Sequence, residues 1–117
     1  MIQTTSITKT LFEVTYEEHA ADVKRISGKN DVVKKYGRTD WSQLHPAIKD
    51  VLVDLRYRGD YTGTTRNRVQ LMVVANDVFG LQETMADKAY WMQNIGVPRD
   101  RFERRADYMA KVLQEFG

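Results

Sequence analysis

The stretch VLVDLRYRGDYTGTTR, residues 51–66, decides the fold, because it joins the most apolar helix of the chain to a polar loop punctuated by glycine. Val51, Leu52 and Leu55 lie at helical spacing. Val53 adds apolar surface on the other side of the same helix. A helix that is apolar around most of its circumference is typical of the centre of a small helical domain. The sequence therefore predicts one buried central helix that is followed by a polar loop at the surface.

Helix-ending and helix-starting residues flank this central helix. Gly59 follows the last apolar turn, where a left-handed residue commonly ends a helix, and Thr62 or Thr64 can cap the helix that follows. Pro46 is suited to the first turn of the central helix, with His45 as part of its start. The polar loop is therefore expected to connect two helices directly.

Helical periodicity continues along the rest of the chain, and no segment alternates long enough to indicate a strand. We expect an all-α fold of about six to eight short to medium helices around the central one. Trp41, Trp91 and Phe102 are expected in the same core as Leu52 and Leu55. The segments with helical spacing are residues 16–27, 30–36, 46–58, 65–75, 77–85, 87–92 and 98–116.

The N-terminal residues carry Thr, Ser and Ile without a clear period. An N-terminal arm over residues 1–15 is therefore expected ahead of a helical domain over residues 16–117. A helical turn opening at Thr8 is the alternative. Thr15 and Glu18 have the spacing of a capping box, so the first helix of the domain is expected to begin directly after Thr15.

Composition excludes several classes of protein. The 117 residues contain no cysteine, so disulfides, thiolate metal sites and cysteine nucleophiles are impossible. No apolar run has the length of a signal peptide or a membrane span. With 18 basic against 16 acidic residues, nucleic-acid binding is not expected.

His19 and His45 lack metal-ligand spacing, so we expect neither metal nor cofactor. Localisation stays open: synthesis is expected in the cytoplasm, with action in the periplasm after export or lysis as one route.

Two segments carry a family resemblance. The runs LVDLRYRGDYTGTTR, residues 52–66, and KAYWMQNIGVPRDRFERR, residues 88–105, resemble the C-terminal helical lobe of phage-type lysozymes, the muramidases that also supply the killing domain of pesticin-like toxins. The resemblance spans roughly residues 16–116 and implies a lysozyme-like helical lobe. In that family the catalytic carboxylates lie in an N-terminal lobe, and residues 1–15 contain no glycine-rich hairpin of that kind. The resemblance therefore implies a chain that is inactive alone, with no catalytic residue of its own.

Two polar segments are candidates for holding a saccharide. Arg and Asp side chains can bond hydroxyl and amide groups, while a tyrosine ring can stack on a sugar. In the lysozymes that the chain resembles, the loop after the central helix borders the substrate cleft. The alternative is that these polar groups satisfy the backbone of a turn between helices. The candidate residues are Arg58, Asp60, Tyr61, Thr62, Tyr90, Gln93 and Asn94.

Charged residues on the central and last helices have structural and functional interpretations. Asp54 lies four residues before Arg58, and a structural ion pair with Arg58 or with an arginine of the last helix is favoured over a catalytic acid. A glycosidase generally needs two carboxylates across the scissile bond, and Asp54 has no convincing second partner. The last helix carries a charged face that is either solvated or a partner-binding patch. Its arginines are Arg99, Arg101, Arg104 and Arg105.

Two functions follow. The first is a peptidoglycan-binding helical lobe of a phage-type muramidase, which acts with a catalytic lobe outside this chain. The second is a non-catalytic lysozyme-like scaffold that binds a protein target through the arginine face, as an inhibitor or immunity-type factor of a phage or toxin system. The sequence leaves open the glycan specificity, the identity of a protein partner and the oligomeric state.

Overall fold

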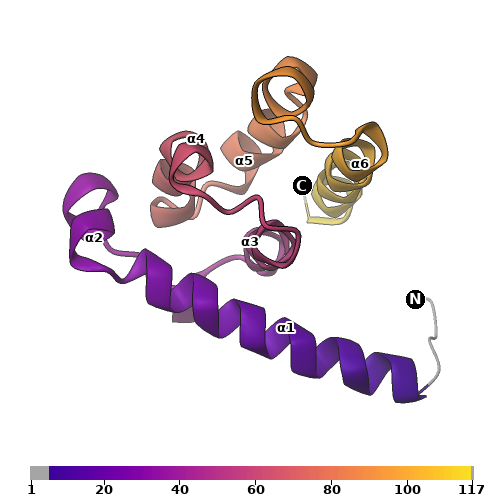
Figure 1. Cartoon of the computed structure of the whole chain (residues 1–117), viewed down its shortest axis with the longest axis horizontal. Helices are drawn as coiled ribbons and strands as arrows, with labels where there is room; N and C mark the ends of the chain where they lie inside the picture. The colour runs from indigo at the N-terminus through magenta and orange to yellow at the C-terminus, as the bar shows by residue number, and fades with distance from the viewer. Residues whose placement is uncertain (1–5, 117) are drawn as a thin grey trace.

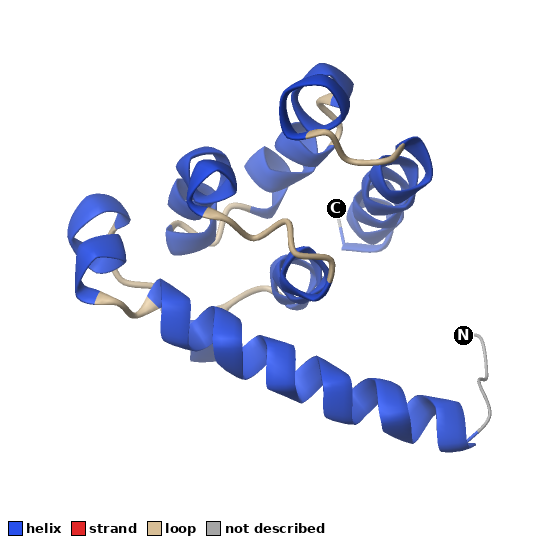
Figure 2. Cartoon of the chain, in the orientation of Figure 1, coloured by secondary structure: helices blue, strands red, loops and turns tan. Residues whose placement is uncertain are grey.

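The computed structural model describes the backbone of residues 6–116 and the side chains of residues 15–115. Within these residues the chain is helical with no strand, which confirms the predicted all-α fold (Figure 2). The elements in order are α1 (Ser6–Ser27), α2 (Asn30–Tyr36), the 3-10 turn η1 (Trp41–Gln43), α3 (Pro46–Tyr57), α4 (Gly63–Val74), α5 (Val78–Met85), the π-helical segment η2 (Ala89–Ile95) and α6 (Arg99–Phe116).

Helix α3 is the central helix that its sequence predicts. It lies between the long α1 on one side and α4, α5 and α6 on the other, while α2 occupies one end of the molecule (Figure 1). Ile48, Leu52 and Leu55 have no exposed surface, and Val51 and Val53 are also buried. Because α3 buries half of its twelve residues, the other helices are arranged by how they cover it.

The core joins residues from all along the chain. Phe102 belongs to the same buried cluster as Leu52 and Leu55, as predicted. Trp41 packs against the cluster but stays partly exposed. Trp91 is buried at 1% exposure, and its indole N–H donates to the carbonyl of Thr84 at 2.8 Å. Burial of this ring therefore leaves no unsatisfied donor.

Local capping groups start and end these helices where the sequence indicates. Gly59 has a φ of 79°, in the left-handed region, directly after α3. The Thr62 hydroxyl accepts a hydrogen bond from the N–H of Thr65 and caps α4. His45 Nδ1 accepts the N–H of Ala47 at 3.0 Å, beside Pro46 in the first turn of α3. These interactions start or end the helices within a residue or two of the predicted positions.

The beginning of α1 differs from the prediction. Helix α1 starts at Ser6, so residues 6–15 of the expected arm continue the helix, and a start directly after Thr15 is wrong. No glycine or proline interrupts the chain between Ser6 and Ser27, so nothing in the backbone stops the helix from extending. The arm residues 1–5 lie outside the described part of the chain. The capping-box pattern at Thr15 is therefore internal to a helix.

Candidate functional site

A cleft of about 640 Å³ lies between α1, α3 and α6. Its volume falls in the range of about 300–1,000 Å³ that small-molecule sites occupy. All three helices contribute polar and aromatic side chains to it. The described lining residues are Thr15, Tyr16 and His19 from α1, Asp50, Val51, Val53, Asp54 and Tyr57 from α3, and Arg101, Arg104, Arg105 and Tyr108 from α6.

Aromatic rings line the cleft on all three helices. Tyr57, at the end of α3, is 56% exposed. The His19 ring meets the Tyr57 ring edge to face, with centroids 5.4 Å apart. The Arg58 guanidinium lies 5.2 Å from the centroid of the same tyrosine ring. Tyr57 is therefore supported by two neighbours while much of its surface stays open to a ligand.

Asp50 accepts hydrogen bonds from the other two tyrosines of the cleft. Its carboxylate accepts the hydroxyl of Tyr16 from α1 and the hydroxyl of Tyr108 from α6, each at 2.5 Å. Burial, followed by the hydrogen bond to Asp50, raises the pKa of both tyrosines well above the ordinary value. Three helices therefore meet at one carboxylate, which fixes the orientation of both rings in the cleft.

An ion-pair network includes three residues that line the cleft, Asp54, Arg101 and Arg105. Arg105 is 4% exposed; its Nε donates to Asp54 Oδ2 at 2.5 Å and its Nη2 donates to Asp60 Oδ2 at 2.9 Å. Arg101 Nη1 donates to the same Asp60 oxygen at 3.2 Å. The structural ion pair predicted for Asp54 is therefore confirmed, and the partner is an arginine of the last helix. Because Arg105 is buried and paired, it is not part of a solvated arginine face.

Tyr61 does not present the ring that a sugar-stacking role requires. It is 5% exposed, its hydroxyl donates to Gln70 Oε1 at 2.7 Å, and burial raises its pKa. The backbone explains this placement, because the N–H groups of Asp60 and Tyr61 both donate to the carbonyl of Leu55, at 2.7 and 3.1 Å. This turn directs the side chain into the core. The prediction of Tyr61 as a stacking residue is corrected.

The rest of the polar loop divides between structural and surface roles. Asp60 is held by the two arginines of α6, and the Thr62 hydroxyl caps α4. Both side chains therefore satisfy groups within the fold, as the alternative interpretation of the loop expected. Arg58 is exposed and has no ion pair among the described residues, and it reaches the cleft only through its contact with Tyr57.

The second predicted segment lies apart from the cleft. Tyr90 is half-buried, meets Trp91 edge to face at 4.9 Å, and has the Arg68 guanidinium 4.5 Å from its ring centroid. Gln93 and Asn94 are exposed. The Tyr90 hydroxyl donates to the carbonyl of Thr64, just after the polar loop, at 3.5 Å. None of these three predicted residues lines the cleft.

The four arginines of α6 have different surroundings. Arg99 pairs with Glu103 of the same helix at 3.2 Å, in an exposed position. Arg101 and Arg105 belong to the network around Asp60. Arg104 lines the cleft, is exposed, and has no ion pair among the described residues. Among the three arginines that line the cleft, Arg104 is therefore the one without an ion pair in the described part of the chain.

Four lining residues were not predicted from the sequence: Tyr16, Asp50, Tyr57 and Tyr108. Asp50 and Tyr57 lie on α3 but outside the polar loop, and the other two lie on the helices farthest apart in sequence. No local spacing connects them. For Asp50 and Tyr57 the one signal is that these polar side chains lie on a helix that is otherwise largely buried, which indicates a structural or functional partner.

Two further observations bear on the site. Among the described residues, no cluster of three His, Cys, Asp or Glu side chains is arranged to hold a metal ion. The described helices also include none with the length and apolar character needed to cross a membrane.

Comparisons with known proteins assign the chain to a family. No curated protein and no solved structure matches this sequence. A family model described as a domain of unknown function, DUF8812, matches residues 2–106. Since this match covers most of the 117 residues, the chain belongs to the DUF8812 family.

Proposed function

We propose that this protein binds a saccharide of the cell wall in the cleft between α1, α3 and α6, without catalysing its hydrolysis. The observation that carries the proposal is the exposed ring of Tyr57 in a cleft that also holds Tyr16 and Tyr108. Sugar rings have apolar faces that pack on aromatic rings, and their hydroxyls need hydrogen-bonding partners beside those rings. The cleft supplies both kinds of group.

The polar groups of the cleft support the orientation of a bound sugar. Asp54 is 40% exposed at its side chain and is fixed by Arg105, so it offers a positioned acceptor. Arg104 supplies donors that no carboxylate of the described chain occupies. Groups held in place before binding lose less conformational freedom when the ligand arrives, which favours affinity.

The resemblance to the helical lobe of phage-type lysozymes supports peptidoglycan as the saccharide. In this proposal the chain holds the glycan, and a catalytic lobe outside it performs the cleavage. The site differs from the one that the sequence suggested: Tyr57, Tyr16 and Tyr108 take the place of Tyr61 and Tyr90 as the aromatic surfaces. The test is a titration of the full chain with a soluble chitooligosaccharide and with a muropeptide, followed by calorimetry or amide chemical shifts.

One observation favours a second candidate, a protein-binding inhibitor or immunity-type factor. Arg104 and Arg58 are exposed cations beside the cleft without ion pairs in the described chain, and such cations steer association with an acidic surface. Two of the four arginines expected to form this interface are engaged around Asp60, which weakens the candidate. Arg58→Glu with Arg104→Glu should abolish capture of a protein partner if this role is the correct one.

A further inference from the structure

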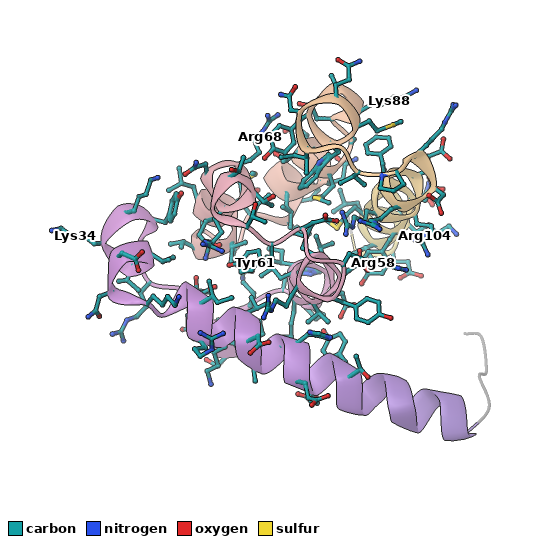
Figure 3. All side chains as sticks on the ribbon, viewed as in Figure 1. Lys34, Arg58, Tyr61, Arg68, Lys88 and Arg104 are labelled. Atoms are coloured by element: carbon teal, nitrogen blue, oxygen red, sulfur yellow. The ribbon has the colours of Figure 1, made fainter. Side chains whose placement is uncertain are left out.

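A second surface, at the opposite end of the molecule from the cleft, concentrates positive charge. Figure 3 shows Lys34 at one end of the molecule and Arg104 toward the other. Residues 24–38 contain six cations and one carboxylate, so this segment carries +5, while the whole chain carries +2. The remaining residues therefore sum to −3. Positive charge is segregated onto the end of α1, the turn after it, and α2.

All six cations of this basic end are exposed to solvent. Arg25 lies 3.6 Å from Asp22, and Lys35 donates to the Asn67 side chain at 2.8 Å. The other four have no ion pair among the described residues. The six residues are Lys24, Arg25, Lys29, Lys34, Lys35 and Arg38. Apart from Arg25, the charge of these cations is therefore not paired within the described fold.

We infer that the basic end is a docking surface for an anionic phospholipid bilayer. A cluster of four to eight lysines and arginines is the pattern that associates with anionic headgroups, at roughly 1 kcal/mol for each residue near the surface. Helix α2, with the adjoining end of α1, lies at one end of the molecule along its longest axis, where a planar surface can approach it from outside (Figure 1). Four of the six cations are lysines, whose flexible point charges suit mobile headgroups.

Features that nucleic-acid surfaces use are missing from the basic end. Tyr36, the aromatic residue of the segment, is half-buried, its hydroxyl donates to Asn67 and Lys35 lies 5.2 Å from its ring centroid, so its ring offers a base only a partly covered face. Helix α2 has seven residues, which is short for a helix that reads a groove. An anionic bilayer requires neither a stacking ring nor a reading helix.

Vesicle binding by the full chain tests the inference. Wild-type protein should bind vesicles of phosphatidylcholine mixed with phosphatidylglycerol and should bind pure phosphatidylcholine vesicles far less, and added salt should release it. The double variant Lys29→Gln with Lys34→Gln should lower the partition coefficient about thirty-fold, as expected for two cations at an anionic surface. The control is Lys88→Gln with Lys111→Gln, which removes the same charge from exposed positions elsewhere and should change partitioning less than about twofold.

Three results would overturn the inference. The first is equal binding to neutral and anionic vesicles. The second is a loss in the control variant as large as in the Lys29/Lys34 variant, because net charge rather than this surface would then govern binding. The third is retention of duplex DNA without retention of vesicles. The saccharide titration of the Lys29/Lys34 variant should match the wild type, so this inference and the proposed cleft function fail independently.

Discussion

Arg105 Nε lies 2.5 Å from Asp54 Oδ2 and joins the last helix to the central one beside the cleft that both residues line. The same guanidinium reaches Asp60 in the loop after α3. One buried side chain therefore positions the start of the loop, the end of α3 and the middle of α6. The cleft depends on α3 and α6, since Asp54 of α3 and Arg101 and Tyr108 of α6 line it.

The first prediction concerns the stability that this contact provides. Arg105→Ala should lower the free energy of unfolding by about 3–5 kcal/mol, because it leaves carboxylates in a partly buried place without their main cation. Arg101→Ala is the comparison: that side chain is 22% exposed, and its loss should cost less than about 1 kcal/mol. Urea denaturation monitored by circular dichroism measures both. Equal small losses would show that the network contributes little to the fold.

The second prediction concerns the central helix. Leu55 has no exposed surface, so Leu55→Ala should cost about 2–5 kcal/mol of unfolding free energy through lost burial and a cavity. Leu71 on α4 is 59% exposed, and Leu71→Ala should change stability by less than about 0.5 kcal/mol. The same denaturation experiment compares them. A Leu55 variant as stable as the Leu71 variant would contradict the position of α3 at the centre.

The third prediction concerns alkaline pH. The pKa of Tyr108 is raised in the folded state by burial and by Asp50, so the unfolded chain loses this proton at a lower pH than the folded chain does. Stability from this group is therefore present below the ordinary tyrosine pKa of about 10 and declines as the pH rises above it. Tyr108→Phe should make the decline of unfolding free energy between about pH 9 and 11 less steep. Parallel curves for variant and wild type would contradict this assignment.

The fourth prediction concerns catalysis. The two cleft carboxylates already accept hydrogen bonds within the chain, Asp50 from two tyrosines and Asp54 from Arg105. Glycoside hydrolysis needs a carboxyl acid that can donate a proton and a second carboxylate across the scissile bond. The purified chain should therefore fail to clear a cell-wall suspension. Clearing that disappears in Asp50→Asn or Asp54→Asn would show that the cleft is an active site.

The central helix and its ends could be predicted from sequence because their causes are local. Apolar residues at helical spacing identify α3, and Gly59 and Thr62 terminate and restart helices through their own backbone and hydroxyl groups. The start of α1 could not be placed in this way. A capping-box pattern at Thr15 identifies a possible helix start, and it has no effect where a continuous helix already bonds the backbone N–H groups.

The cleft could not be predicted because its residues meet only through tertiary packing. Tyr16, Asp50 and Tyr108 come from three helices, and their contact depends on how α1 and α6 lie against α3. The wrong prediction of a surface role for Tyr61 has a local cause instead. A polar loop indicates a surface, yet two backbone hydrogen bonds to Leu55 direct that ring into the core.

Saccharide binding at Tyr57 tests the proposed function most directly. Tyr57→Ala removes an aromatic surface of the cleft, while Phe79→Ala removes one of similar exposure, 60% against 56%, from α5 outside the cleft. Wild-type protein should bind a chitooligosaccharide or a muropeptide at millimolar or lower concentration. Tyr57→Ala should weaken that binding about tenfold, and Phe79→Ala should leave it unchanged. Absence of binding by the wild type to both ligands, or equal losses in the two variants, would contradict a saccharide site in this cleft.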